Sequence, residues 1–278
     1  MFSIVIPTFN NLEYLMLCIK SIKKNSIYNH EIIVHVNEGK DGTLDYVKTN
    51  NITYTYSENN IGLCSAVNQA AEKAKTNYIL YSHDDMYFCP GWDSILKKEL
   101  DILDTKLFYL SGSMIEQNSG HIKLDCGSDF KNFNEKKLLE NYKNKKFQDF
   151  QGSHWAPHLI HKDLWVRIGG LSEEFNPGIG SDPDLNMKLW KEKVRIFKGI
   201  ADFRVYHFGS ISLRKKSNFK RNKGAKTFLK KWGITIKFFK KHYLKSDTSF
   251  KGPLSEPVHN LNYFIGLLVC KIKSIFTI

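Results

Sequence analysis

The chain has 278 residues, of which 42% are hydrophobic and 25% charged, an ordinary globular composition that excludes a disordered chain. This length is sufficient for one α/β domain with an elaborated C-terminal part, or for two small domains. The net charge of +13 is concentrated, because residues 203–246 hold fourteen Lys or Arg and no Asp or Glu, so the other residues sum to 13 − 14 = −1. A near-neutral body with one basic segment argues against a nucleic-acid-binding protein, which would usually spread its basic residues over the fold.

The spacing of the cysteines and the length of the apolar stretches indicate the cellular compartment of the protein. The five cysteines form no C-x-x-C pair, and we interpret them as reduced thiols of a cytoplasmic protein: Cys18, Cys64, Cys89, Cys126 and Cys270. Met1 leads directly into the strand-like residues 2–6, so no signal peptide is predicted. No stretch has the ~18 uninterrupted apolar residues that a membrane span needs. We expect a cytoplasmic protein, with peripheral attachment to the inner face of the cytoplasmic membrane as an open alternative.

Strand-like and helix-like segments alternate over the first 82 residues. Strands are predicted at residues 2–7, 31–36, 52–56 and 78–82, and helices at 12–24, 43–48 and 63–75. This alternation predicts an α/β fold with a mostly parallel, Rossmann-like sheet flanked by helices on both faces.

The pattern is weaker in the later part of the chain. Residues 130–150 are rich in Lys and Asn and are predicted to form a surface excursion, and helices are predicted at 164–171 and 184–193. The basic segment contains a further helix candidate, because five apolar residues recur every three or four positions: Phe228, Trp232, Ile236, Phe239 and Tyr243. Lysines on its other faces are typical of helices at a membrane surface.

Polar clusters follow each of the four predicted N-terminal strands. They are residues 8–10, 37–41, 59–62 and 83–85. Parallel α/β sheets bind ligands outside the carboxyl ends of their strands. The four clusters therefore predict one crevice of nucleotide size on a single rim of the sheet.

The acidic pair Asp84–Asp85 at the end of the fourth strand is a candidate metal site. Mg²⁺ and Mn²⁺ prefer oxygen ligands, and one or two carboxylates are sufficient where phosphates and waters complete the shell. Taken alone, an Asp-Asp pair is more typical of an ordinary acidic turn than of a metal site.

The sequence around this pair resembles the D-x-D segment of family 2 glycosyltransferases. Similar motifs occur in the same order over roughly residues 1–210, and each is weak alone. They are Ile4-Val5-Ile6-Pro7-Thr8-Phe9-Asn10, Asn37-Glu38-Gly39-Lys40-Asp41-Gly42-Thr43, Glu58-Asn59-Asn60-Ile61-Gly62 with Ala66 and Asn68, Tyr81-Ser82-His83-Asp84-Asp85 with Pro90-Gly91-Trp92, and Gly169-Gly170-Leu171-Ser172-Glu173-Glu174-Phe175 with Ser181-Asp182-Pro183-Asp184-Leu185.

The resemblance implies a GT-A-like fold and an inverting glycosyltransferase. A catalytic domain is expected at residues 1–210, with a nucleotide-binding half at 1–110 and an acceptor and catalytic half at 111–210, followed by a basic, partly amphipathic helical region at 211–278. The implied reaction moves a hexosyl or N-acetylhexosaminyl group from a nucleoside-diphosphate sugar, taken to be a UDP-sugar, to a hydroxyl of a glycan or lipid-linked glycan. The implied cofactor is Mn²⁺ or Mg²⁺.

The resemblance also assigns residues. Asp85 matches the metal ligand, with Asp84 at the diphosphate and sugar, and Asp182 matches the general base. His207 resembles a late histidine that reaches the metal, although a buried core histidine is an equal alternative. The wall of the nucleoside pocket is matched by Pro7, Thr8, Asn10, Asn37 and Asn60.

Three positions depart from the family pattern. His83 stands where many members have the first Asp of D-x-D, and Asn37 replaces the Asp that reads the base. Ser181 replaces a Glu beside the base, which predicts a less basic Asp182, because like charges raise carboxylate pKa values. Asp184 is predicted to orient the helix that follows it.

Two further groups have several interpretations. His154, Trp155 and His158 are expected to face the acceptor. The three histidines His154, His158 and His161 also suggest a zinc site, but their spacing offers no fourth ligand. The basic C-terminal region is either a solvated lysine face, a surface for an anionic membrane near a lipid-linked acceptor, or, least favoured, a nucleic-acid contact.

Three other functions compete with glycosyl transfer. The departures at His83 and Ser181 are compatible with a catalytically silent nucleotide-sugar or glycan-binding protein on the same fold. A nucleotidyltransferase would share the metal carboxylates but needs a Gly-rich loop, and residues 7–12 contain no glycine. A nucleic-acid-binding protein is the third, and its affinity for DNA would fall steeply as the salt concentration rises.

Overall fold

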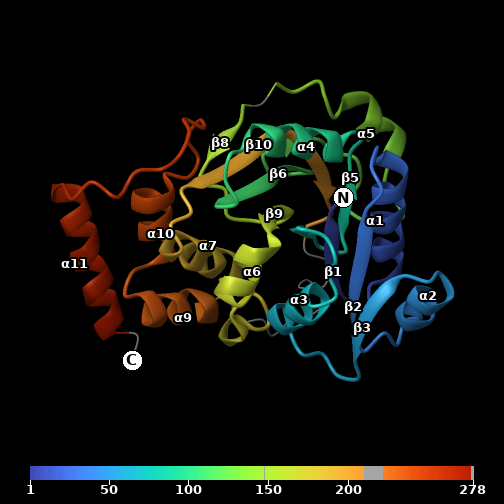
Figure 1. Cartoon of the computed structure of the whole chain (residues 1–278), viewed down its shortest axis with the longest axis horizontal. Coiled ribbons are helices and arrows are strands. Elements are labelled where there is room, and N and C mark those ends of the chain that lie inside the picture. Colours follow the sequence, from blue (N-terminus) through green and yellow to red (C-terminus); the bar gives the residue numbers. More distant parts are fainter. Residues whose placement is uncertain (147, 210–221, 277–278) are drawn as a thin grey trace.

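The computed structural model describes residues 1–146, 148–209 and 222–276 (Figure 1). Its described strands form one ten-stranded sheet in the order β3-β2-β1-β4-β9-β6-β10-β5, with β7 beside β6 and β8 beside β10. The sheet runs through the middle of the molecule, and the last helix, α11, lies at the end opposite α2 (Figure 1). The five cysteines are all buried and free.

The N-terminal half has the parallel α/β arrangement that the sequence predicted. The strands β1 (Ser3–Phe9), β2 (Glu31–Asn37), β3 (Thr53–Ser57) and β4 (Tyr78–Tyr81) pair in parallel. They are connected by α1 (Leu12–Asn25), α2 (Thr43–Thr49) and α3 (Leu63–Ala71). Helix α3 is shorter than predicted, because Lys73 and Ala74 donate to carbonyls three residues back and tighten the last turn.

The second half of the sheet is mixed and adds antiparallel pairs to the parallel pattern that the sequence predicted. Strand β9 (His158–His161) is antiparallel to both β4 and β6 (Phe108–Glu116). The long β10 (Ile196–His207) is parallel to β6 but antiparallel to β5 (Met86–Phe88) and β8 (Phe150–Gln151). Strand β7 (Ile122–Lys123) extends the edge of β6.

Four helices and a 3₁₀ turn accompany these strands. They are α4 (Trp92–Ile102), α5 (Glu135–Asn141), α6 (Lys162–Ile168), η1 (Glu173–Phe175) and α7 (Ser181–Lys191). Helix α5 lies within the segment that was predicted as a surface excursion. Helices α6 and α7 begin two and three residues earlier than predicted, because the pattern of apolar residues does not mark a first turn made of polar residues.

The basic C-terminal region is folded against the body. It forms α9 (Asn222–Trp232), α10 (Ile236–Phe239), a π-helical turn η2 (Lys240–Leu244) and α11 (Leu261–Ile275). The single helix predicted here is broken at Gly233, whose φ is +72°. Phe228 and Phe239 are fully buried in the same core as the strands. The aromatic stripe that suggested a membrane surface therefore faces the protein interior.

Asp184 connects α7 to α9. Its fully buried carboxylate accepts from the Trp232 indole at 2.8 Å and from the Ser172 hydroxyl at 2.6 Å, and it lies 3.0 Å from the Lys231 ammonium. A buried charge with three partners is well compensated. Asp184 thus has the orienting position that the sequence suggested, and it fixes α9 rather than only its own helix.

Gly224 brings α9 close to the loop before α7. A Cβ atom at this position would lie 1.9 Å from the carbonyl oxygen of Ile179. Only glycine allows this approach, so α9 packs directly against the backbone of residues 179–180.

We expect Gly224→Ala to destabilise the protein. Helix propensity alone would give about 0.5–1 kcal/mol of stabilisation, whereas the clash with backbone should cost about 1–3 kcal/mol. Chemical denaturation measures whether the free energy of unfolding falls or rises, with the exposed Lys226→Ala on the same helix as the control. A more stable Gly224→Ala protein would show that α9 does not rest against this loop.

Candidate active site

A cavity of about 320 Å³ opens at the carboxyl ends of β1, β2 and β4. Because these strands are parallel, the polar residues that follow them converge on one rim. Seven of the predicted site residues line this cavity: Pro7, Thr8, Asn37, Asn60, Asp84, Asp85 and Asp182. Residues 177–181, which lead into α7, form its other wall.

Two asparagines join the segments that form the walls. Asn176 accepts from the backbone N–H of Cys64 and donates to the Ser65 hydroxyl, both at 2.8 Å, and so holds the start of α3. Asn68 exchanges two hydrogen bonds of 2.8 Å with the backbone of Leu171. Asn68 and Leu171 belong to two of the motifs seen in the sequence, and their role is to connect the two halves of the cavity.

The nucleoside side of the cavity is arranged by hydrogen bonds within the protein. The Thr8 hydroxyl donates to the Asp84 carboxylate at 2.7 Å. The side-chain oxygen of Asn37 accepts from the Ser57 hydroxyl at 3.1 Å and from the N–H of Ile61 at 3.0 Å. Since an amide oxygen has two lone pairs, these bonds occupy it and leave the NH₂ group of Asn37 as the part that can bind a ligand.

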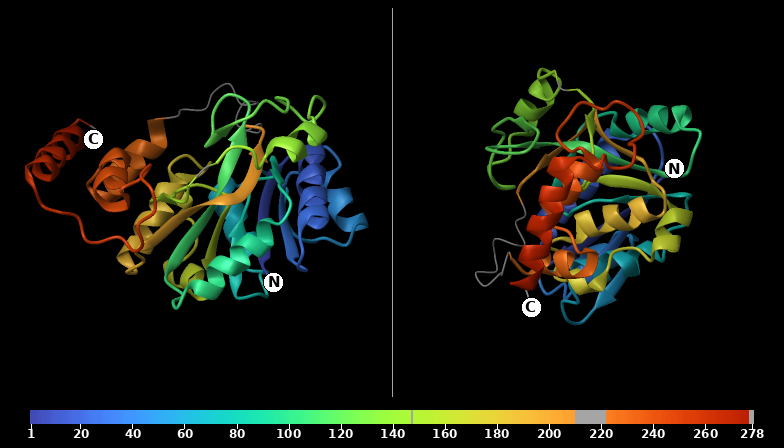
Figure 2. Two further views of the ribbon diagram at one scale, coloured as in Figure 1. Left: turned by 90° about the horizontal axis from the view of Figure 1, so that it is seen from above. Right: turned by 90° about the vertical axis from the view of Figure 1, so that its left-hand side faces the viewer.

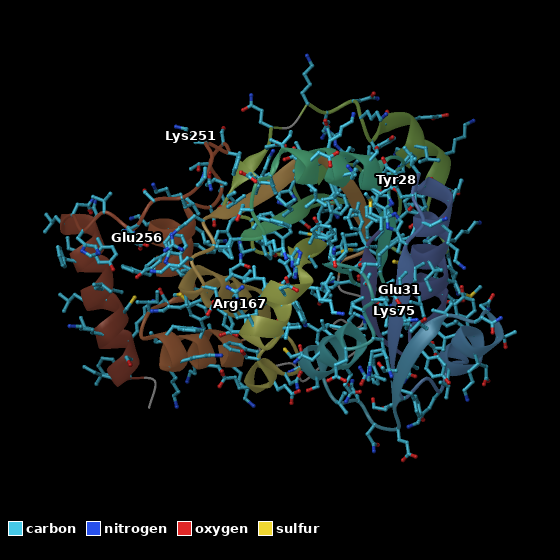
Figure 3. The ribbon with its side chains drawn as sticks, viewed as in Figure 1. Tyr28, Glu31, Lys75, Arg167, Lys251 and Glu256 are labelled. Atoms are coloured by element: carbon cyan, nitrogen blue, oxygen red, sulfur yellow. The ribbon has the colours of Figure 1, made fainter. Side chains whose placement is uncertain are left out.

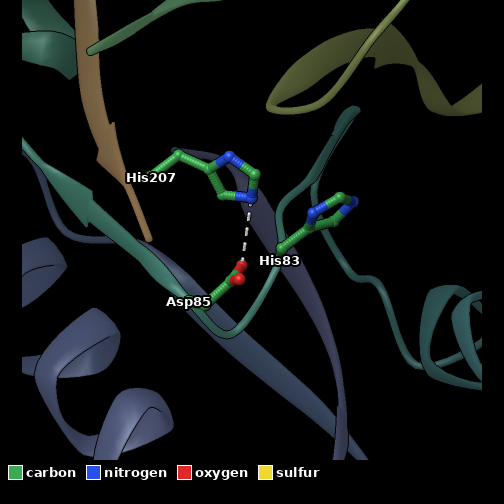
Figure 4. A group of neighbouring side chains, drawn as sticks. All are labelled: His83, Asp85 and His207. Carbon is green, nitrogen blue, oxygen red and sulfur yellow. Dashed lines mark ion pairs between the residues drawn. The ribbon is translucent and has the colours of Figure 1, made fainter. Parts of the chain in front are cut away.

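His83, Asp85 and His207 form a cluster beside the cavity (Figure 4). One ligand atom from each lies within 4.8 Å of the others. His207 Nε2 is 3.4 Å from Asp85 Oδ1, and its Nδ1 is 2.6 Å from Glu116 Oε1. The His207 ring is therefore held by a carboxylate on each side.

Strand register produces this cluster. His207 at the end of β10 pairs with Met86, the residue after Asp85, and Tyr206 pairs with Ile115, the residue before Glu116. Three residues far apart in the chain thus meet because β10 lies between β5 and β6.

The protonation of the two histidines differs. Burial alone would lower the pKa of His207, but Asp85 and Glu116 outweigh it and raise the pKa to about 10. His83 has its pKa lowered to about 4, chiefly by burial, so its imidazole is neutral at pH 7 and can act as a ligand.

The cluster fits a divalent cation. Two ligands of one ion, each at about 2.1 Å, lie at most about 4.2 Å apart, so the 4.8 Å spread closes with small side-chain movements. His207 Nε2 is buried and faces Asp85 Oδ1 at 3.4 Å, so a cation bound between them would replace this ion pair. A histidine supported by a second carboxylate is the usual arrangement of a metal ligand.

Asp182 lies at the start of α7, on the opposite wall from β4. Burial raises its pKa from 3.8 to about 7. Its Oδ1 atom is buried and has no hydrogen-bond partner among the described residues. The sequence suggested a less basic Asp182 for want of an acidic neighbour; in the structure it is desolvation, and not a neighbouring charge, that raises the pKa of this carboxylate.

Besides His207, four predicted residues are not among those that line the cavity. Asn10 accepts from the N–H of Lys40 at 2.9 Å and donates to Glu38 at 3.3 Å, so it shapes the turn after β2. His158 is fully buried and packs between the rings of Tyr81 and Tyr109.

His154 and Trp155 lie next to each other with their rings in contact, and Trp155 also stacks on Phe150 and His121. The packing gives these residues a structural position, and their contact with an acceptor stays a prediction.

Glu116 is the residue that sequence reasoning missed. It stands at the end of a strand, like the predicted site residues, but no motif surrounds it. The signal that could have found it is the polar end of the apolar run at residues 108–115.

A cavity at the carboxyl ends of parallel strands, with the cluster of His83, Asp85 and His207 beside it and the buried Asp182 in its lining, lies where α/β proteins bind their ligands. The model of glycosyl transferase family 2 matches residues 3–164. This is more than half of the chain, which therefore belongs to glycosyl transferase family 2.

Relatives agree with this membership. A glycosyltransferase of Rickettsia typhi is 35% identical over 123 residues, 42% of this chain and 38% of that protein. Hyaluronan synthase of Pasteurella multocida is 25% identical over 227 residues, 79% of this chain and 22% of that protein. The matches thus span less than two fifths of these relatives' own length.

Solved structures show the same fold. Residues 1–349 of S. aureus TarS in complex with UDP match with a TM-score of 0.57 and 14% identity, over 86% of this chain and 74% of that chain. GalNAc-T7 with UDP, GalNAc and Mn²⁺ matches with a TM-score of 0.57 and 18% identity, over 74% of this chain and 43% of that one. The fold is of the GT-A type, as the sequence predicted.

We expect Asp182→Asn to stabilise the protein more at pH 8 than at pH 5. The folded-state pKa of about 7 exceeds the ordinary 3.8, so between these values the folded protein holds a proton that the unfolded chain has lost, and stability falls as the pH rises. Asparagine does not ionise and avoids this loss. Thermal unfolding in EDTA at pH 5 and pH 8 measures the difference in stability between the variant and the parent, with the exposed Asp104→Asn as the control. An equal effect of Asp182→Asn at both pH values would contradict a raised pKa.

We expect Glu116→Gln to weaken Mn²⁺ binding by about 10–100-fold, the usual effect of removing the second partner of a metal-ligating histidine. Calorimetric titration with Mn²⁺ in the presence of UDP measures the affinity, and the exposed Glu72→Gln should leave it unchanged. Unaltered Mn²⁺ affinity in the Glu116 variant would show that His207 needs no support to bind the ion.

Proposed function

We propose that this chain is an inverting glycosyltransferase that moves a hexosyl or N-acetylhexosaminyl group from a UDP-sugar to an acceptor hydroxyl. The observation that carries the proposal is one cavity lined by Asp84, Asp85 and Asp182, with His207 beside Asp85. A diphosphate site and a proton acceptor then stand on facing walls. Membership of the family and the UDP in two neighbouring structures support the choice of donor.

The donor's nucleoside is assigned to the β1–β2 side of the cavity. Pro7, Thr8 and Asn60 form the wall there, and the NH₂ group of Asn37 donates to a carbonyl oxygen of the base. Asn10 acts indirectly by holding the turn after β2. An amide donor at this position suits uracil, whose edge presents two carbonyl oxygens.

Asp85 and His207, with His83, are assigned to a divalent cation. A bound cation would neutralise the negative charge of the diphosphate leaving group. Two imidazoles favour Mn²⁺ over Mg²⁺, whose ligands in proteins are almost all oxygens. Asp84, oriented by the Thr8 hydroxyl, is assigned to the sugar and diphosphate.

Asp182 is assigned as the general base. Its carboxylate takes the proton of the acceptor hydroxyl while that oxygen attacks the anomeric carbon. The bond from this carbon to the diphosphate oxygen breaks, and UDP leaves with the electron pair. Because the attack comes from the face opposite the diphosphate, the configuration is inverted. A pKa of about 7 suits this role, because a base works best when its pKa lies near the working pH.

The acceptor is proposed to be a hydroxyl of a glycan or lipid-linked glycan, which fits synthesis of a cell-surface polysaccharide at the cytoplasmic face of a membrane. His154 and Trp155 remain candidates for contact with it. His83, in place of a carboxylate, favours a second candidate: a protein that binds the nucleotide sugar on this fold without turnover.

We expect Asp85→Ala and Asp182→Asn each to lower turnover by about 10²–10⁴-fold, the range for removing a charge-stabilising or proton-transfer group. Release of UDP from a set of UDP-sugars, with Mn²⁺, Mg²⁺ or EDTA, measures donor hydrolysis and transfer. The exposed Asp104→Asn should retain full activity.

The two variants separate the competing functions. Donor binding by Asp182→Asn without turnover is expected of an enzyme that has lost its base. Metal-dependent UDP binding with no turnover by the parent protein, on any donor and a broad acceptor panel, would favour the binding protein. Turnover that is unchanged in both variants would end the assignment of this site.

A further inference from the structure

Helix α11 has two apolar faces, and the protein buries one. Tyr263 packs on Phe238 with ring centroids 5.1 Å apart, and its hydroxyl lies 3.4 Å from that of Tyr243. A Cβ atom at Gly266 would lie 2.8 Å from the Phe238 ring, so glycine allows the close approach of α10. This face holds the helix in a fixed position.

The opposite face of α11 is apolar and exposed. Its eight large apolar side chains are between 45% and 82% exposed: Leu261, Phe264, Ile265, Leu268, Val269, Ile272, Ile275 and Phe276. They recur every three or four residues and so form one stripe. Figure 2 shows the helix at the outer end of the molecule, away from the central sheet. A contiguous patch of this kind marks an interaction surface.

The C-terminal region that carries this face is strongly basic. Residues 222–276 contain eleven Lys and two acidic residues, a net charge of 11 − 2 = +9. One of the two acids, Glu256, which is labelled with Lys251 in Figure 3, already pairs with Arg195. Lys241, Lys245 and Lys271 are exposed. An apolar stripe with a lysine-rich margin is the pattern of a helix that lies in a membrane interface.

The charge distinguishes between the possible occupants. A second copy would bring two regions of +9 together, and charged residues are depleted from the centres of protein interfaces. An anionic bilayer complements the charge and accepts the apolar side chains. A helix of 15 residues is about 22 Å long, which is shorter than the ~30 Å hydrocarbon core. In agreement, none of the described helices has the length and apolar character of a membrane span.

We propose that the exposed face of α11 inserts into the interface of an anionic lipid bilayer, with the helix parallel to the surface. The sequence suggested the aromatic stripe that begins at Phe228 for this role, but the protein buries that stripe. The assignment of α11 is independent of the reaction proposed above, because it depends only on the C-terminal helices.

The experiment is co-sedimentation of the full chain with vesicles. We expect binding to vesicles of phosphatidylcholine that contain about one third phosphatidylglycerol, because each lysine near an anionic surface strengthens the attraction. Binding should weaken with added salt and be much weaker on pure phosphatidylcholine. Phe264→Ser/Leu268→Ser should lower the vesicle partition coefficient at least tenfold.

A matched variant tests the location. Ile102→Ser/Val166→Ser removes two apolar side chains on α4 and α6 that are even more exposed than Phe264 and Leu268, and this variant should bind vesicles like the parent. Circular dichroism checks that both variants are folded. Absence of binding to anionic vesicles, or equal loss of binding in both variants, would overturn the proposal. A lipid-free dimer that Phe264→Ser/Leu268→Ser converts to a monomer would assign the face to a second copy instead.

Discussion

The pairing of β10 with β5 and β6 determines whether the candidate site can exist. Register alone sets His207 beside Asp85 on one side and beside Glu116 on the other. A slip of one residue would turn His207 to the other face of the sheet and remove it from the cluster. The twelve residues of β10 and their buried apolar side chains make such a slip costly. The stability of the sheet and the geometry of the cluster thus depend on the same set of backbone hydrogen bonds.

Asp182 illustrates how a site can reduce the stability of the fold around it. Desolvation raises its pKa to about 7, so the charged carboxylate is less stable in the folded protein than in water. The loop before it contains Gly178 and Gly180, both with positive φ, and rests on Gly224 of α9. The surrounding structure therefore holds Asp182 where ionisation is unfavourable. A carboxylate in such a place is a stronger base than one on the surface.

The sequence predicted local features well and long-range pairing poorly. The first four strands follow from short apolar runs, and their polar ends predicted five residues that line one cavity, while the family resemblance added Pro7 and Asp182. The antiparallel β9 and the position of β10 could not be predicted, because neither hydrophobic period nor turn residues specify which distant strand becomes a neighbour. Glu116 was missed for the same reason: its importance comes from its neighbour on β10. The higher basicity of Asp182 depends on burial, which a sequence neighbour such as Ser181 does not report.

The basic C-terminal segment combines two tasks that its composition does not separate. Helix α9 faces inward: Trp232 and Lys231 contact the buried Asp184, and Gly224 supports the loop that precedes Asp182. Helix α11 faces outward with an apolar stripe. Between them, Phe238 contacts Tyr263 while its neighbour Phe239 enters the core. Helix α11 is therefore connected to the active-site wall through α10 and α9. Because these contacts are aromatic and closely packed, attachment at α11 would orient the whole cavity rather than deform it.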